Sequence, residues 1–283
     1  MSEMICDSLR RQAARCRLRI LQMLRASGRG HIGGAYSAMD IITALYFYKM
    51  QLDPGDPQNP DRDRFILSAG HKCLAQYAAL AERGYFPPDL LDTFGHLDSR
   101  LPGHPDMHKL PGVEANTGAL GHGLSIAVGM ALGLRLDRRN ARVYVVMGDG
   151  ELAEGSNWEA MAAAAHHKVD NLVMFLDNNG LQISGDVREI MDFSPYAQRI
   201  AAFGWAVQEI DGNNMEEIVD ALDHLPLESG KPTAIIAHTV KSKGLSFGEG
   251  RVEYHYWKPT DAELDQAEAE CRSVLARYGG ERL

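Results

Sequence analysis

The sequence lacks several features that mark particular classes of protein. It has only four cysteines in 283 residues and no CxxC pair, so a zinc site is not expected. No apolar signal segment begins the chain, because five arginines interrupt residues 10–19. The longest apolar stretch, residues 124–134, is too short to cross a bilayer. These absences predict a cytoplasmic protein with reduced thiols.

Positive charge is also scarce. The formal net charge is −9 and no basic stretch is sustained, which argues against a nucleic-acid partner. An anionic ligand would have to be bound by local geometry, because the protein has no overall positive field. Hydrophobic residues make up 45% of the chain and charged residues 24%, as in ordinary globular proteins. A chain of this length can bury a core without a disulfide or a metal.

The apolar segments indicate an α/β fold. RVYVVM (142–147) and NLVMFLD (171–177) are continuously apolar, as in strands buried on both faces of a parallel sheet. Helical patterns alternate with such strands, which predicts a doubly wound, mostly parallel sheet with helices on both faces. The chain has no evident repeat or linker, so residues 1–283 are expected to form a single domain. Further strands are expected at 64–70, 205–211 and 232–240, and helices at 5–26, 37–50, 71–83, 155–167, 195–203, 214–224 and 260–278.

Three local features refine this prediction. Ser37 fits the N-cap of the helix over 37–50, with Asp40 in the first turn. Five prolines between residues 84 and 116 predict a long loop, and such loops in compact domains are usually functional. The glycine-rich segment that starts at residue 116 is expected to open a buried helix that runs to residue 134.

Polar residues follow both central apolar strands. Gly148, Asp149 and Gly150 come after the first strand, and Asn179 comes after the second, with a helix between them. This is a βαβ unit, and its parallel strands end at the same edge of the sheet, about 4.8 Å apart when adjacent. We therefore expect Asp149 and Asn179 to meet at the edge where open α/β sheets bind ligands.

These residues suit a magnesium ion that also binds a diphosphate. Mg²⁺ prefers oxygen ligands and uses few carboxylates together with phosphate oxygens. Asp149, Asn179 and the backbone carbonyl near Leu181 supply three such oxygens. Gly148 and Gly150 let the backbone approach the anion, and the following helix directs its N-terminus at it. Either turn alone is ordinary, but the pair at this spacing is specific. The chain has no P-loop, and the dinucleotide-like GALGHGLSIAVG has no strand before it.

The same segment resembles the GDG…NN cofactor signature of thiamine diphosphate enzymes. Around it, nearly the whole chain resembles the N-terminal half of a transketolase. The matching segments, in chain order, are RGHIGGAYSAMDI (29–41), LSAGHKCLAQYAAL (67–80), LPGHPDMHKLPGVEANTGALGHGLSIAVGMALG (101–133), GDGELAEGSNWEA (148–160), DNNGLQISG (177–185), FGWAVQEIDGNN (203–214) and HTVKSKG (238–244).

The resemblance implies the N-terminal subunit of a split transketolase. Such a subunit would bind thiamine diphosphate with Mg²⁺, or with Ca²⁺ or Mn²⁺ instead. A separate C-terminal, pyrimidine-binding subunit would supply the glutamate that activates the cofactor and most groups that bind the sugar phosphate, in an α₂β₂ assembly. The implied reaction transfers a two-carbon ketol unit from a ketose phosphate to an aldose. The chain alone would be inactive.

The resemblance also assigns roles to individual residues. His31, His71 and His104 would line the cavity over the thiazolium ring, and His255 would reach both cofactor and substrate. These histidines would exchange protons with sugar hydroxyls near neutral pH. Tyr256 and Trp257 depart from the family pattern, which usually has a smaller residue here. The expected cofactor contacts are His71, Gly118, Leu120, Gly148, Gly150, Glu154, Asn179, Ile183 and His255, with Leu120 and Ile183 as apolar props and Glu154 at the subunit interface.

Other functions remain open at this point. Gly118, Leu120 and Ile183 suit plain core packing equally well, and Glu154 suits a charge at a helix N-terminus.

Within the cofactor class, a deoxyxylulose-phosphate synthase or a 2-oxo acid dehydrogenase subunit is the nearest alternative function, although several histidines favour sugar chemistry. A cofactor-binding module without activity is the rival from another class. A pentose phosphate is the default substrate, with a branched or modified sugar as the alternative.

Overall fold

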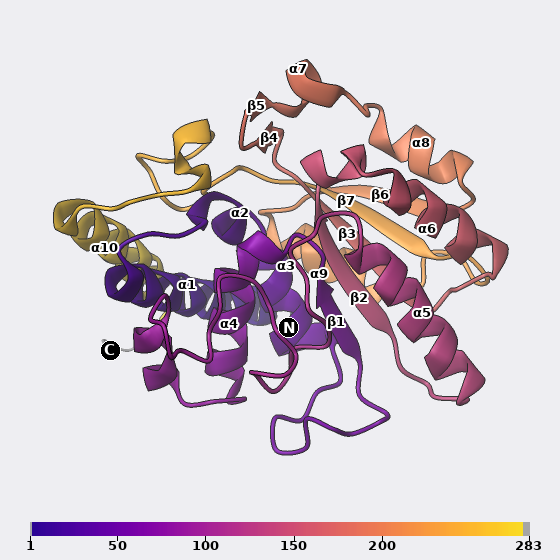
Figure 1. The fold of residues 1–283 in the computed structure, drawn as a ribbon, viewed down its shortest axis with the longest axis horizontal. Helices are drawn as coiled ribbons and strands as arrows, with labels where there is room; N and C mark the ends of the chain where they lie inside the picture. Colours follow the sequence, from indigo (N-terminus) through magenta and orange to yellow (C-terminus); the bar gives the residue numbers. More distant parts are fainter. Residues whose placement is uncertain (1, 280–283) are drawn as a thin grey trace.

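The computed structural model describes residues 2–279 and is built around a five-stranded parallel sheet (Figure 1). Its strands lie in the order β1-β2-β3-β7-β6, and all four neighbouring pairs are parallel. The predicted α/β fold with a parallel sheet is therefore confirmed. The strands are β1 (Arg64–Leu67), β2 (Val143–Gly148), β3 (Leu172–Asn178), β6 (Ala206–Asp211) and β7 (Thr233–His238).

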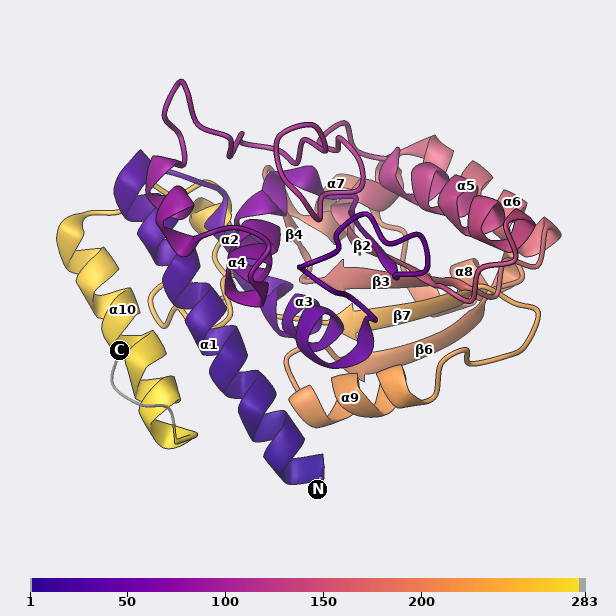
Figure 2. The same ribbon diagram turned by 90° about the horizontal axis from the view of Figure 1, so that it is seen from below.

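Helices cover both faces of the sheet, as Figures 1 and 2 show. The side chains of the central strands alternate between two cores, because successive residues of a strand point to opposite faces. Val146 and Phe175 enter the core beneath α1, α3, α4 and α9, whereas Val145 and Met174 enter the core beneath α5, α6 and α8. In residues 2–279 both faces of the sheet are thus covered by helices, which favours ligand binding at the ends of the strands.

Most of the longer helices agree with the predicted segments, whereas the short helices α2 and α7 were not predicted. The bounds are α1 (Ser2–Ser27), α2 (Ile32–Ser37), α3 (Met39–Ala44), α4 (Cys73–Arg83), α5 (Gly123–Leu136), α6 (Gly155–His166), α7 (Val187–Met191), α8 (Tyr196–Ala202), α9 (Met215–Asp223) and α10 (Asp261–Arg277). Short 3₁₀ turns cover Gly70–Lys72, Pro88–Thr93, Gly150–Ala153 and Val252–His255, and a π-helical turn covers Leu45–Lys49. The short strands β4 (Leu181–Gln182) and β5 (Gly185–Asp186) pair with each other.

None of the helices within residues 2–279 is long and apolar enough to cross a membrane.

Two local predictions are wrong. Residues 37–50 do not form one helix, and Ser37 is not an N-cap: it is the last residue of α2. Its hydroxyl instead donates to Asp177 Oδ2 at 2.6 Å, so a buried carboxylate from another part of the chain decides its role. The strand expected over 64–70 ends at Leu67, because the Ser68 hydroxyl donates to the buried Glu151 and the 3₁₀ turn begins at Gly70.

A buried ion pair joins α1 to α3. The Arg17 guanidinium donates to both oxygens of Asp40, at 2.8 and 3.0 Å, and both side chains are almost fully buried. Asn213, in the turn between β6 and α9, donates to the same carboxylate at 3.0 Å. One carboxylate therefore holds three separate parts of the chain together.

We predict that Asp40→Ala lowers the free energy of unfolding by about 3–5 kcal/mol, because it leaves the Arg17 charge buried without a partner. Urea unfolding followed by circular dichroism measures this change. Asp98→Ala removes an exposed aspartate and should change stability by less than about 0.5 kcal/mol. If the two variants are equally stable, the ion pair does not hold α1 and α3 together.

Candidate active site

A cavity of about 260 Å³ lies at the carboxyl edge of the sheet. Residues that follow β1, β2, β3 and β7 line it, together with residues from the start of α2 and from the loop before α5. The structure brings the following predicted site residues to its wall: His31, His71, Gly118, Leu120, Gly148, Asp149, Gly150, Asn179, Leu181, Ile183 and His255. His104 and Glu154 are not among its lining residues.

Asp149 and Asn179 lie together at this edge, as the βαβ unit requires. β2 pairs with β3 so that Gly148 is opposite Asp177. The Asp149 carboxylate accepts hydrogen bonds from the backbone N–H groups of Gly150, at 2.8 Å, and Gly180, at 2.6 Å. Burial, and next the nearby Asp177, raise the Asp149 pKa to about 6. A cation bound here would favour the charged form of Asp149 again.

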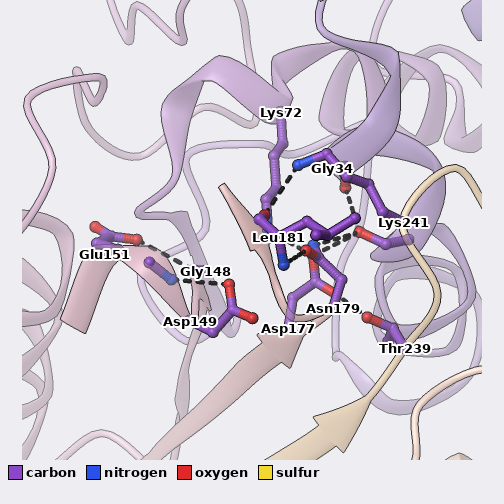
Figure 3. A network of polar contacts seen from close by, with 12 residues as sticks. Gly34, Lys72, Gly148, Asp149, Glu151, Asp177, Asn179, Leu181, Thr239 and Lys241 are labelled. Carbon is purple, nitrogen blue, oxygen red and sulfur yellow. Dashed lines mark hydrogen bonds and ion pairs between the residues drawn. The ribbon is translucent and has the colours of Figure 1, made fainter. Parts of the chain in front are cut away.

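Asp177 is a buried carboxylate at the centre of a polar network (Figure 3). The Lys72 ammonium lies 2.5 Å from its Oδ2, and both side chains are buried. Ser37 and Asn179 donate to the same oxygen, and the Thr239 hydroxyl donates to Oδ1. Sequence reasoning missed Asp177 and Lys72. For Asp177, the feature that could have revealed it is a charged residue at the end of the apolar run LVMFLD.

Lys241 is a second buried cation that sequence reasoning missed. Its ammonium donates to the Leu181 carbonyl at 2.9 Å and to His255 Nδ1 at 3.0 Å. Burial, followed by the charge of Lys72, lowers the Lys241 pKa to about 8. Lys241 therefore still carries its charge at neutral pH, and it can attract an anion into the cavity. Its position shortly after β7, at the same edge as Asp149, was the available signal.

Glu151 joins the glycine-rich turn before α5 to the turn after β2. Its carboxylate accepts hydrogen bonds from the N–H groups of Gly121, at 3.0 Å, and Gly148, at 3.2 Å, and from the Ser68 hydroxyl. Burial raises its pKa. Sequence reasoning did not single out Glu151. Glu154, which the resemblance assigns to the subunit interface, is exposed at the N-cap of α6.

Three histidines form a cluster on the wall of the cavity. The ring centroids of His31, His71 and His255 are 5.4 to 5.5 Å apart, and His71 stacks on His255. Burial is the main cause that lowers their pKa values, to about 4 for His31, 2 for His71 and 3 for His255. All three rings are therefore neutral at pH 7. Because His255 Nδ1 accepts from Lys241, its proton lies on Nε2.

His104 lies just outside this cluster. Its ring centroid is 6.5 Å from that of His31, and it lines a second cavity of about 230 Å³ that His31 and His71 also line. Gly118, with a φ of +141°, lies against the His104 ring: a Cβ at Gly118 would be 2.7 Å from it. The close approach explains the glycine at this position.

The arrangement fits a diphosphate with a divalent cation. Within residues 2–279 no cluster of three or more His, Cys, Asp or Glu side chains suits a metal on its own. Asp149, the Asn179 amide oxygen and the Leu181 carbonyl offer only three oxygens, so a cation there would need further ligands from a bound anion. A Cβ at Gly150 would lie 2.9 Å from the Gln182 side chain, so this close approach explains the glycine at this position.

A larger groove elsewhere does not suit this chemistry. It measures about 800 Å³ and is lined mainly by charged residues of α1 and α10. Four of its charged side chains already form ion pairs: Arg19 contacts Glu82 at 2.6 Å, and Arg25 contacts Glu268 at 2.8 Å. The cavity at the sheet edge has buried, ligand-facing charges, and we take it as the active site.

Known proteins share this fold and these segments. Residues 9–271 match the family described as transketolase, thiamine diphosphate binding domain. The chain is 44% identical to one of the subunits of the apulose-4-phosphate transketolase of Actinobacillus succinogenes, over 94% of this chain and 96% of that one. It is also 44% identical to the 6-deoxy-6-sulfo-D-fructose transketolase subunit SqwG of a Clostridium species, over 94% of this chain and 99% of that one.

A solved structure agrees with these relatives. The transketolase of Campylobacter jejuni superposes with a TM-score of 0.87 at 29% identity, covering 95% of this chain and 45% of that one. The fold and the site define a cofactor-binding domain whose site lies at the carboxyl edge of a parallel sheet. The chain belongs to the transketolase thiamine diphosphate binding domain family, and it is a component of a transketolase-type enzyme.

We predict that His71 makes stability depend on pH. Its pKa is 6.5 in the unfolded chain and about 2 in the folded protein. As the pH falls, the unfolded state therefore takes up the proton at a higher pH than the folded state does. The stabilisation is present above pH 6.5 and is lost as the pH falls. From pH 7 to pH 5, the wild-type protein should lose about 2 kcal/mol more free energy of unfolding than His71→Gln. Urea titrations at both values measure the difference, and equal losses would mean that His71 titrates normally.

Proposed function

We propose that this chain is the thiamine diphosphate- and Mg²⁺-binding subunit of a two-chain transketolase, with Ca²⁺ or Mn²⁺ as alternative metals. It would transfer a two-carbon ketol unit from a ketose phosphate to an aldose. The observation that carries the proposal is the cluster of neutral histidines next to the oxygen set of Asp149, Asn179 and Leu181 in one cavity. Such histidines suit reactions at sugar hydroxyls, and they favour sugars over 2-oxo acids as substrates.

Each part of the cavity has a separate task in this proposal. Asp149, Asn179 and the Leu181 carbonyl would hold the metal, while Gly148 and Gly150 admit the diphosphate. Lys241 lies next to this carbonyl and adds a positive charge for the same anion. Leu120 and Ile183, on the same wall, would prop the cofactor rings, and Gly118 would offer backbone contacts. When bound, the cofactor supplies the carbanion that attacks the ketose carbonyl.

The histidines would move protons during transfer. A neutral ring can accept a proton from a sugar hydroxyl, which a charged ring cannot. Burial keeps His31 and His71 neutral and so leaves a ring nitrogen free to accept, while it also makes both rings weaker bases than a free histidine. His255 carries its proton on Nε2 and suits donation to a developing alkoxide. His104, on the second cavity, would contact a part of the sugar farther from the metal.

The proposal requires a second chain. Both relatives described above are named as single subunits of transketolases, which supports a partner that carries the pyrimidine-binding half. We expect one diphosphate-binding domain over residues 1–283, an α₂β₂ assembly in the cytoplasm, and Glu154 at the interface. Those relatives are named for apulose 4-phosphate and a sulfonated fructose, which favours a modified anionic ketose over a common pentose phosphate.

We predict that Asp149→Ala abolishes Mg²⁺-dependent binding of thiamine diphosphate, because it removes the only carboxylate of the oxygen set. Isothermal titration of the complex purified from native cells, with and without Mg²⁺, measures the affinity. Asp98→Ala, on the surface, is the control and should bind as the wild type does. Unchanged affinity in Asp149→Ala would refute the metal assignment.

Activity should require both chains. We expect the purified complex to transfer a ketol unit with thiamine diphosphate and Mg²⁺ present, and the isolated chain to show none, because the activating glutamate is supplied by the partner. A coupled assay of the released aldose measures both. A complex that binds the cofactor and transfers no ketol unit from any ketose tested would instead support a binding module without activity.

A further inference from the structure

A second cavity adjoins the cofactor cavity and shares only His31 and His71 with it. We call it the outer cavity. It measures about 230 Å³. Its lining residues include Arg29, His31, Leu74, Phe94, His104 and Tyr256. None of the proposed metal ligands lines it. A substrate whose ketol unit meets the histidines from the cofactor side would therefore extend the rest of its carbon chain into the outer cavity.

The backbone fixes Tyr256 in the wall of the outer cavity. Gly30 and Trp257 form an antiparallel bridge, with N–H to carbonyl distances of 3.0 and 2.9 Å in the two directions. Trp257 is buried and packs against the rings of Phe247 and Tyr254. This bridge sets the residue before Trp257 beside the residue after Gly30.

Tyr256 consequently lies directly against His31. The two ring centroids are 4.7 Å apart with the planes at 67°, an edge-to-face contact. Tyr256 is 41% exposed, so part of its ring remains available to a ligand. It lines the outer cavity and is not among the residues that line the cofactor cavity. Its ring therefore limits the space for the sugar chain and leaves the space around Asp149 unaffected.

We infer that Tyr256 determines substrate specificity, by narrowing the outer cavity beside His31 so that substrates with a short carbon chain beyond the reacting carbon are preferred. This inference rests on the proposed ketol transfer. The ring, and not the hydroxyl, carries the effect, because the contact with His31 is made by the ring. Leu74 and Phe94 also line the outer cavity, together with polar residues such as Arg29 and His104, so the steric limit comes from the Tyr256 ring.

The test compares two aldose phosphate acceptors of different chain length. The complex of both chains is assayed with 3-hydroxypyruvate as donor, because this donor carries only a carboxylate beyond its ketol unit. The acceptors are glyceraldehyde 3-phosphate, with three carbons, and ribose 5-phosphate, with five. The readout is the ratio of kcat/KM for the longer acceptor to that for the shorter one, with kcat and KM resolved.

Tyr256→Ala should raise this ratio about tenfold, because a change of one wall group in a pocket typically shifts discrimination by that order. Tyr256→Phe keeps the ring and should keep the wild-type ratio. Tyr256→Trp fills more of the cavity and should lower the ratio, which tests the inference even if the alanine variant does not assemble. Leu136→Ala removes an exposed apolar side chain on α5 and should leave the ratio unchanged.

The possible outcomes distinguish failure of the proposed ketol transfer from failure of the inference on Tyr256. If the wild-type complex transfers no ketol unit to either acceptor, the proposed function fails. If it does transfer the unit, and the ratio is the same in the wild type, Tyr256→Ala and Tyr256→Trp, the inference fails and the proposed function stands. If Tyr256→Phe shifts the ratio as far as Tyr256→Ala does, the hydroxyl sets the preference, and the steric account is overturned.

Discussion

The site depends on one buried charge, the carboxylate of Asp177. It has no contact with solvent, and Lys72, Ser37, Asn179 and Thr239 all donate to it. A buried carboxylate that loses its partners is very unfavourable, so these donors are held in place. They belong to α2, to the turn before α4, to the turn after β3 and to the segment that follows β7. The Asp177 carboxylate therefore fixes the position of these segments, and so of the cavity wall, relative to the sheet.

The cavity suits an anion although the protein is acidic overall. Lys72 and Lys241 are buried beside it, and after burial itself their charges lower the pKa values of His71 and His255 further. The same cations that would favour a diphosphate therefore add to the effect of burial and keep His71 and His255 neutral, which also makes these rings weaker bases than a free histidine. This local electrostatic effect is not visible in the net charge of −9.

The parts of the site that depend on local sequence were predictable, and the parts that depend on distant contacts were not. Asp149 and Asn179 follow two apolar strands of one βαβ unit, so the pattern alone placed them at the same edge. Lys72 and Asp177 are 105 residues apart, and neither has a local motif. Ser37 suits an N-cap locally, but a carboxylate 140 residues away determines its hydrogen bond. The fold itself was predictable because alternating apolar strands and helices allow few arrangements.

The most direct test of ketol transfer follows the carbon atoms themselves. Xylulose 5-phosphate labelled with ¹³C at its first two carbons, or a modified ketose if the enzyme requires one, is incubated with the complex, an aldose acceptor, thiamine diphosphate and Mg²⁺. NMR then locates the label. The account predicts both labelled carbons, still bonded to each other, at the head of the product ketose. Label that remains in the donor, or that leaves as carbon dioxide, would contradict it.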